Sequence, residues 1–469
     1  MRIRAAVAAL LILTLAAASS GAESPVAREI DRYLKAREAL GQFNGTVLVV
    51  NRTGVVLRKS YGFANLELAV PGTPKTSYEI ASLSKAFTAA AVLLLRDDGK
   101  LTLDDSICRF TEDCPEAWRP VTIGELLRHT GGIPDYESAL EMGSPAYADA
   151  MARTDAARRL VDAARSKPLD FAPGSKFNYS NTGYLLLGFA IEKASGMSYR
   201  DFLQRRILTQ LGLDSTGVID RERIQKNRAD GYTGAPDTPP QQIYAGFSFA
   251  DGPLRRAIYT RLASPEGDAS MYSTVDDLYT WVTALATGKL LSPDSLHAMF
   301  TPGPGNYGMG WFITKRFGRD LVMHTGNLPG FLCEIDRYAG GDLTVIALSN
   351  YDSGRFGKAV KDIGAIALHE PYDLPRSHTI VSIDRSAFDG FTGEYQTTDG
   401  RTLVISQGKK MLEAQMKGEY TAGLLPESAT QFYMPFAEGT FRFGDVKDGK
   451  AGTVTMHYNG KDLVAKRVQ

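Results

Sequence analysis

The stretch Ile80-Ala81-Ser82-Leu83-Ser84-Lys85-Ala86-Phe87-Thr88 is the most informative part of the sequence. It leads into the apolar run 89–95, which predicts a buried helix from about Ser82 to Asp97. Because Ser82 and Lys85 are three residues apart, a helix places both side chains on one face, with Cβ atoms about 5–6 Å apart. An amine beside a hydroxyl can take the hydroxyl proton and turn serine into a nucleophile. The positive potential of a helix N-terminus lies close to the same serine.

Spacing alone does not establish a catalytic site, because Ser406 and Lys409 repeat it in a segment that runs into a glycine turn. Two further motifs support the first copy. Tyr179-Ser180-Asn181 precedes a helix predicted at 184–194, and His324-Thr325-Gly326 ends a strand predicted at 320–324. A tyrosine hydroxyl near a lysine can act as a base or proton shuttle. A strand edge beside a serine can donate a backbone N–H to an oxyanion.

These three motifs, in this order, resemble the signature of the penicillin-binding protein and serine β-lactamase superfamily. A tyrosine in the middle motif points to its class C-like branch, which includes D-alanyl-D-alanine carboxypeptidases, D-aminopeptidases and esterases. The resemblance covers about residues 25–370. It includes the framing segments 125–135, 171–174, 307–311 and 345–350.

The resemblance implies a role for each matching residue. Ser82 would be the acylated nucleophile, Lys85 would accept its proton with help from Tyr179, and Asn181 would orient the substrate amide. The backbone N–H groups of Ser82 and Asn327 would form the oxyanion hole, and Tyr179 would activate water for deacylation. His324, Thr325 and Gly326 would line the substrate site.

His324 stands where β-lactamases and most carboxypeptidases of this superfamily carry a lysine that holds a substrate carboxylate. Histidine is mostly uncharged near neutral pH. The sequence therefore predicts a serine hydrolase that cleaves D-amino-acid-containing peptides or esters. The alternatives are a β-lactamase and a non-hydrolytic protein that binds penicillin or senses peptidoglycan.

The pattern of elements predicts an α/β (α+β) fold class with two domains. Residues 23–370 would form an antiparallel sheet flanked by helices, with a separate helical lobe at about 98–300. The linker 371–384 would lead to a small β-barrel at 385–469 that resembles the lipocalin-like barrel of some of these hydrolases. There such a barrel helps assembly or covers the active-site cleft, so a homo-oligomer formed through the barrel is a further expectation. The Gly- and Pro-rich residues 231–265 are interpreted as a long functional loop.

Residues 1–22 have the pattern of a secretory signal peptide, with Arg2 and Arg4 before an apolar run and small residues at 20–22. An N-terminal membrane anchor is the alternative. We expect an exported protein, periplasmic or secreted, with no membrane span after cleavage. The 53 basic and 53 acidic residues argue against a nucleic-acid partner. The expected partners are instead a small peptide, ester or β-lactam substrate, and peptidoglycan.

Export to an oxidising compartment predicts a disulfide between Cys108 and Cys114, with two free thiols as the alternative. Cys333 lies in an apolar run and is expected to be a buried free thiol. No cysteine or histidine spacing indicates a metal site, and no cofactor is expected. His129-Thr130-Gly131 repeats the third motif but follows a predicted helix, so it is interpreted as a structural turn.

Overall fold

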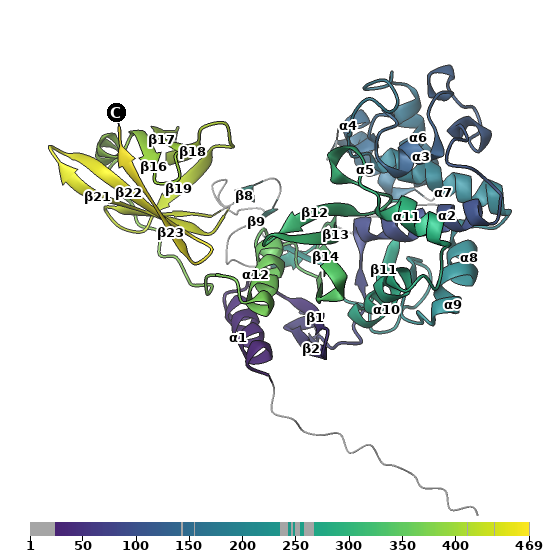
Figure 1. The fold of residues 1–469 in the computed structure, drawn as a ribbon, viewed down its shortest axis with the longest axis horizontal. Coiled ribbons are helices and arrows are strands. Elements are labelled where there is room, and N and C mark those ends of the chain that lie inside the picture. The colour runs from purple at the N-terminus through teal and green to yellow at the C-terminus, as the bar shows by residue number, and fades with distance from the viewer. Residues whose placement is uncertain are drawn as a thin grey trace, which may run out of the picture.

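A six-stranded antiparallel sheet lies at the centre of the structure, a computed structural model (Figure 1). Its strand order is β12-β13-β14-β15-β1-β2, so the two earliest strands complete a sheet built by four late ones. The strands are β1 Gly45–Asn51, β2 Gly54–Tyr61, β12 Phe312–Arg316, β13 Arg319–Leu328, β14 Phe331–Tyr338 and β15 Leu343–Ser349. The antiparallel sheet predicted within residues 23–370 is therefore confirmed.

The structure describes residues 24–141, 144–153, 155–234, 243–244, 247–248, 254–257, 267–409, 411–435 and 437–468. The predicted signal peptide at 1–22 lies outside these residues, as does most of the loop predicted at 231–265. Within that loop the structure describes four short strands, namely β7 Tyr232–Gly234, β8 Ile243–Tyr244, β9 Phe247–Ser248 and β10 Leu254–Arg256. Among the described helices, none has the length and apolarity needed to cross a membrane.

Helices α1 (Pro25–Ala39) and α12 (Phe356–Leu368) cover one face of the sheet. The hydroxyl of Ser24 caps α1 by accepting the N–H of Ala27 at 3.1 Å, which satisfies one of the unpaired donors of the first turn. Ile30, Tyr33 and Leu34 repeat at helical spacing and are buried against the sheet. This spacing is the pattern of an amphipathic helix that buries one face.

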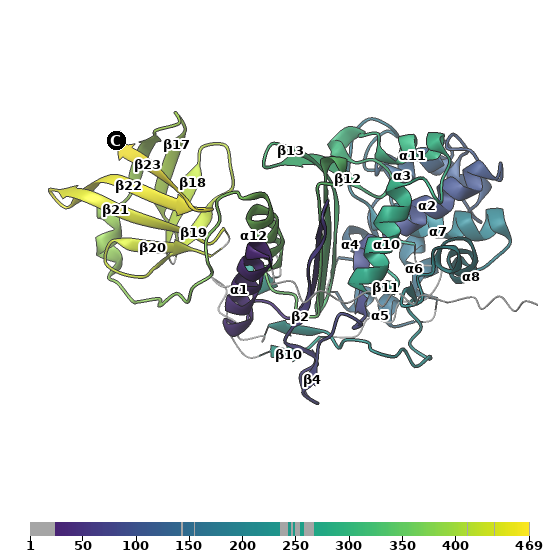
Figure 2. The ribbon, with the colours of Figure 1, turned by 60° about the horizontal axis from the view of Figure 1, so that its bottom comes forward.

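A helical lobe covers the other face, so that the sheet stands between the lobe and the pair α1 and α12 (Figure 2). Its long central helix is α2 (Ser84–Asp97), which is buried from Ser84 to Leu95. The other helices are α3 Ile123–Leu127, α4 Tyr136–Ala139, α5 Pro145–Ala152, α6 Ala156–Arg165, α7 Asn181–Ser195, α8 Tyr199–Leu203, α9 Thr209–Leu211, α10 Val275–Ala286 and α11 Pro293–Phe300. Five short strands form two small sheets beside the main one. One contains β5 Tyr78–Glu79, β11 Met271–Ser273 and β6 Gly217–Val218, and the other contains β3 Phe63–Asn65 and β4 Val70–Pro71.

The chain ends in a closed antiparallel barrel, as predicted. Its strands are β16 Gly393–Thr397, β17 Thr402–Gln407, β18 Leu412–Met416, β19 Ala422–Pro426, β20 Gln431–Met434, β21 Gly439–Lys447, β22 Lys450–Tyr458 and β23 Lys461–Arg467. Tyr395, Phe432 and Phe443 are among the side chains that fill its interior. The barrel therefore has a hydrophobic core of its own.

The barrel docks on the α1 and α12 side through a buried ion network. Glu438, in the turn between β20 and β21, reaches Arg37 of α1 at 2.5 Å and Arg355 at the start of α12 at 3.0 Å. Arg355 also donates a hydrogen bond to the carbonyl of Pro435 at 3.2 Å. Because the helical lobe lies on the opposite side of the sheet, the barrel in this arrangement does not cover that lobe (Figure 2).

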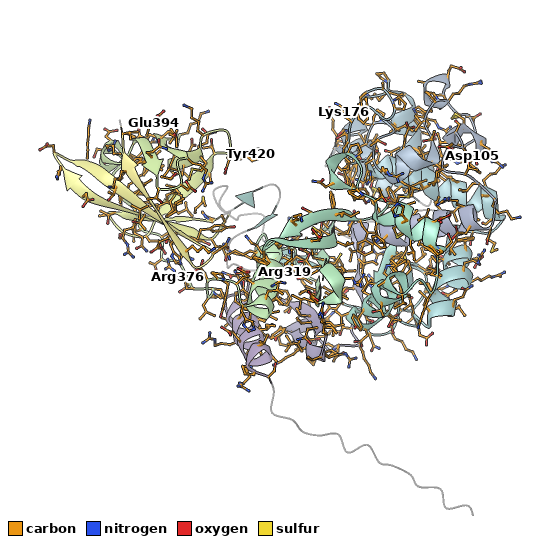
Figure 3. The ribbon with its side chains drawn as sticks, in the orientation of Figure 1. Asp105, Lys176, Arg319, Arg376, Glu394 and Tyr420 are labelled. Carbon is orange, nitrogen blue, oxygen red and sulfur yellow. A yellow bond between two sulfur atoms is a disulfide. The ribbon has the colours of Figure 1, made fainter. Side chains whose placement is uncertain are left out.

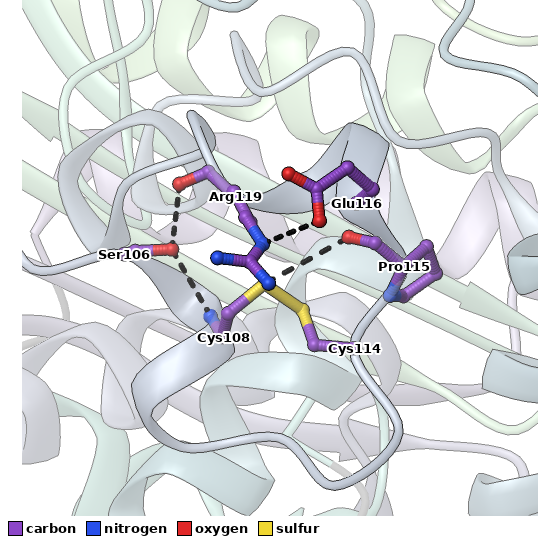
Figure 4. Close-up of a disulfide and its surroundings, with 6 residues drawn as sticks. All are labelled: Ser106, Cys108, Cys114, Pro115, Glu116 and Arg119. Carbon is purple, nitrogen blue, oxygen red and sulfur yellow. Dashed lines mark hydrogen bonds and ion pairs between the residues drawn. A yellow bond between two sulfur atoms is a disulfide. The ribbon is translucent and has the colours of Figure 1, made fainter.

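Cys108 and Cys114 form a disulfide on the helical lobe (Figure 4). The hydroxyl of Ser106 accepts the N–H of Cys108 at 3.2 Å and donates to the carbonyl of Arg119 at 2.7 Å, which ties the two ends of the loop together. Cys333, by contrast, is a buried free thiol.

Candidate active site

Ser82 and Lys85 lie where the lobe meets the sheet. Ser82 sits in a 3₁₀ turn, η1 (Ala81–Leu83), immediately before α2, rather than in the first α-helical turn that the spacing predicted. Lys85 is fully buried, and its Nζ donates hydrogen bonds to Ser82 Oγ at 3.0 Å and to Asn181 Oδ1 at 2.8 Å. A third bond goes to the carbonyl of Asp268 at 2.9 Å. The amine is thus held within proton-transfer distance of the serine hydroxyl.

The backbone just before Ser82 adopts an uncommon conformation. Ala81 has a φ of 47°, in the left-handed region that alanine rarely occupies. Strained backbone of this kind persists only where the surroundings hold it, and it is frequent at active sites. At this turn, the Cys333 thiol donates to the carbonyl of Ile80 at 2.9 Å and ties the segment to β14.

The Tyr-x-Asn motif is placed by the start of α7. This helix begins at Asn181, three residues before the predicted position, because Ser180 caps it by accepting the N–H of Gly183 at 3.4 Å. The Asp135 carboxylate accepts the N–H of Asn181. The Tyr179 ring centre lies 5.0 Å from the Nζ of Lys85. The motif therefore meets the Ser82 and Lys85 pair, although no hydrogen bond from the Tyr179 hydroxyl to either residue is present in the described part of the chain.

His129 belongs to this site, although the sequence indicated only a structural turn. His129 does lie in a turn, with a φ of 57°. Its ring also packs against Tyr179, with the two ring centres 4.2 Å apart. Its Nδ1 accepts the N–H of Ser180 at 3.0 Å, and its carbonyl accepts the N–H of Asn178 at 2.9 Å. His129 thus holds the segment on both sides of Tyr179. The signal that could have identified it is its place in a second His-Thr-Gly, upstream of the Tyr-x-Asn motif.

His324 is fully buried on β13 and is held as a neutral ring. Its Nδ1 lies 2.6 Å from the carbonyl of Thr325, which can only accept, so Nδ1 carries the proton. Its Nε2 lies 3.0 Å from the Tyr307 hydroxyl and accepts from it. Burial, helped by the nearby charge of Lys85, lowers the pKa of His324 to about 3. At neutral pH this position therefore contributes no positive charge.

The strand edge beside Ser82 is open to a substrate. β12 pairs with β13 only as far as Met323, so 324–328 continue beyond that partner. Asn327 and Thr325 are exposed there. Gly326 is required by the close approach of the chain, since a Cβ at this position would lie 2.4 Å from the carbonyl oxygen of Ile80. The free edge at 324–328 therefore leaves backbone groups that a substrate can pair with.

Three carboxyl groups lie on the lobe side of the same site. Burial raises the pKa of Asp135 and of Asp268, and the charge of Lys85 offsets part of this effect at both groups. Burial and the neighbouring Asp135 and Asp268 raise the pKa of Glu137 to about 7. This side of the site therefore favours cationic over anionic substrate groups. Among the described residues, no three His, Cys, Asp or Glu side chains are grouped to hold a metal ion.

Comparisons with known proteins agree with this arrangement. The family model described as Beta-lactamase matches residues 30–368. Penicillin-binding protein 4* of Bacillus subtilis is 31% identical over 416 residues, which cover 85% of this chain and 90% of that protein. A D-aminopeptidase of Gluconobacter oxydans is 29% identical over 344 residues, which cover 71% of this chain and 60% of that protein. The crystal structure of D-amino acid amidase from Ochrobactrum anthropi SV3 is similar with a TM-score of 0.61 and 26% identity, covering 74% of this chain and 98% of that one.

Proposed function

Because the chain belongs to the beta-lactamase family, we propose that it is a serine hydrolase that works through an acyl-enzyme on Ser82. The observation that carries the proposal is the position of the buried Lys85 Nζ, 3.0 Å from Ser82 Oγ. Its substrates are D-amino-acid-containing peptides, amides or esters. The relatives named D-aminopeptidase and D-amino acid amidase support this substrate class.

The proposed reaction has two halves. In acylation, Lys85 Nζ, which donates three hydrogen bonds in the resting site, first gives up one proton to solvent. Ser82 Oγ then attacks the substrate carbonyl carbon while its own proton passes to Lys85 Nζ. The N–H groups of Ser82 and Asn327 stabilise the oxyanion, and the proton then goes to the departing amine or alcohol. In deacylation, Tyr179 helps remove a proton from the attacking water, and the acid product leaves Ser82 free. Asn181 keeps Lys85 in place and orients the substrate amide.

The charges of the site support an amine-bearing substrate over one with a carboxylate. His324 is neutral, so it offers no cation where a β-lactam or C-terminal carboxylate would lie. Asp135, Glu137 and Asp268 lie on the other side and favour an ammonium group instead. The site thus fits the amine-bearing end of a D-amino-acid amide.

The test is a comparison of one purified sample on nitrocefin, p-nitrophenyl acetate, D-alanine p-nitroanilide and a D-Ala-D-Ala peptide. Turnover of D-alanine p-nitroanilide or of the ester is expected, with a much lower kcat/KM on nitrocefin. The Ser82→Ala variant is the control and should be inactive. Hydrolysis that survives this substitution on every substrate would overturn the proposal.

A second candidate is a non-hydrolytic penicillin-binding protein, which the relationship to penicillin-binding protein 4* favours. Such a protein would be acylated at Ser82 but would release no product. A covalent adduct with fluorescent penicillin that stays stable for hours, together with no turnover of the four substrates, would support it over the hydrolase.

Export to the periplasm or the medium is part of the proposal. Its basis is the N-terminal pattern of Arg2, Arg4 and a short apolar run. N-terminal sequencing of protein recovered from a bacterial host should find a chain that starts after Ala22. Full-length protein confined to the cytoplasm would contradict this expectation.

His324→Lys should shift preference toward carboxylate substrates. A lysine adds a cation beside the open edge of β13, and a hydrogen bond to a charged group contributes about 1.5–3 kcal/mol. The ratio of kcat/KM on nitrocefin to that on D-alanine p-nitroanilide should rise about tenfold or more. His324→Gln, which stays neutral, is the matched control and should leave this ratio nearly unchanged. An equal ratio in both variants would show that charge at 324 does not set specificity.

His129→Phe should slow turnover while leaving the protein folded. Phenylalanine keeps the ring beside Tyr179 but leaves the N–H of Ser180 without its acceptor, which costs about 1–3 kcal/mol. Because Ser180 adjoins Tyr179, loss of this hydrogen bond should leave Tyr179 less firmly held. We therefore expect kcat to drop about 10- to 100-fold, with a smaller change in KM. His129→Gln retains an acceptor and should recover part of the rate. Equal kcat values in the wild type and His129→Phe would show that His129 has no role in positioning Tyr179.

A further inference from the structure

A cavity of about 470 Å³ lies between the helical lobe and the sheet, apart from the residues placed in the candidate active site. It is bounded by the end of α10, by α11, and by the outer parts of β13 and β14. Its volume is in the range of small-molecule sites in proteins. Val322, one of its lining residues, precedes His324 by two positions on β13.

Apolar side chains line one side of this cavity. Leu285 of α10 is buried, and Leu296 and Phe300 of α11 and Val322 of β13 are half-buried around the opening. All four belong to, or pack against, the main hydrophobic core. Gly340 and Gly341 lie at one side and add no side chain to close the space. The cavity can therefore take an apolar group.

Arg337 supplies the cation of the cavity. It lies opposite Val322 in the register of β13 and β14, and it is half-buried. In the described part of the chain, its guanidinium has no hydrogen bond and no ion pair. Asp320, the acidic residue that also lines the cavity, is paired instead with Lys315 at 2.6 Å. Burial lowers the pKa of Arg337, and the nearby Tyr279 offsets only part of this effect.

A half-buried guanidinium without a partner favours an anion that can bind it through two parallel hydrogen bonds. A carboxylate has this geometry, and a single arginine matches its single negative charge. We propose that the cavity binds an aliphatic carboxylate, with the carboxylate on Arg337 and the chain along Leu285, Leu296 and Phe300. The same chemistry is present in a fatty acid and in the C-terminus of an apolar peptide.

The probe for the test is octanoate, titrated into the full-length protein by calorimetry. Saturable binding to the wild type is expected, and Arg337→Gln should weaken it about 10- to 100-fold, as for loss of a charge-assisted hydrogen bond. Arg319→Gln is the matched control and should not change affinity, because Arg319 is exposed at the start of β13 and does not line the cavity (labelled in Figure 3). Arg337→Lys keeps a cation and should bind with intermediate affinity.

Two further ligands, octanol and N-acetyl-leucyl-leucine, are titrated in the same way. Octanol should bind equally to the wild type and Arg337→Gln, since it has no charge. N-acetyl-leucyl-leucine titrated beside octanoate identifies the source, because the ligand with the lower Kd on the wild type is the one whose apolar part fits the cavity better. If Arg337→Gln does not fold, the comparison of Arg337→Lys with the wild type replaces it. Octanoate affinity that is unchanged by the substitutions at 337, or the absence of saturable binding, would overturn the proposal.

Discussion

Replacing Lys85 by methionine is expected to lower kcat/KM on the preferred substrate by about 10²–10⁴, the contribution typical of a positioned acid–base group. Lys85 is buried and bonded to both Ser82 Oγ and Asn181 Oδ1, so its loss removes the proton acceptor and the contact that holds Asn181. Methionine fills a similar volume, which limits the effect on packing. The measurement is steady-state kinetics together with the thermal midpoint of each variant.

The chain supplies a matched control for Lys85. Ser406 and Lys409 have the same spacing, but both are exposed at the end of β17 in the barrel. Lys409→Met should therefore leave kcat/KM unchanged. If Lys85→Met and Lys409→Met had the same activity, the three-residue spacing at Ser82 would have no catalytic meaning.

Replacing Glu438 by glutamine is expected to destabilise the protein by about 3–5 kcal/mol, because it removes the carboxylate that two buried arginines share. Glu438 binds both Arg37 and Arg355, and Arg37 is fully buried. Burial would raise the pKa of Glu438, but the hydrogen bonds and charges of Arg37 and Arg355 outweigh it and hold the pKa at about 2. Denaturant unfolding at neutral pH measures the loss.

The pH dependence of this interaction has a definite sign. Because the pKa of Glu438 is lower in the folded state than its ordinary value of 4.5, its contribution is complete above that value. It is lost as the pH falls toward 2. The Gln variant should show a smaller loss of stability over this interval. Glu419→Gln, which changes an exposed pair with Arg401, is the control and should cost less than about 1 kcal/mol. Equal stability of the two variants would contradict a role for Glu438 in docking the barrel.

Much of the fold could be predicted because its elements have strong local patterns. The amphipathic spacing of α1, the apolar run of α2 and the alternating strands of the barrel each specify their own structure. The Ala- and Arg-rich residues 147–166 have the composition of one continuous helix, whereas the structure has α5 and α6. Arg153 takes an extended conformation there, with ψ of 158°, and ends α5. No glycine or proline marks this break, so the pattern alone could not locate it.

The site was predictable only in part. Ser82, Lys85, Asn181 and Tyr179 were predicted from motifs, and the structure brings all four together around the amine of Lys85. His129 was missed because its contribution depends on contacts across about 50 residues of sequence, such as the bond from Ser180. The neutral state of His324 was expected, but its cause, burial with Tyr307 as donor, depends on tertiary packing.

The most direct test of the central claim is intact-protein mass spectrometry after rapid acid quenching of the enzyme with p-nitrophenyl acetate. One acetyl group per chain is expected in the first turnover, located by peptide mapping to the segment that contains Ser82. The adduct should be absent in Ser82→Ala and should disappear as turnover proceeds in the wild type. Turnover without any adduct, or an adduct on another residue that persists in Ser82→Ala, would contradict the account.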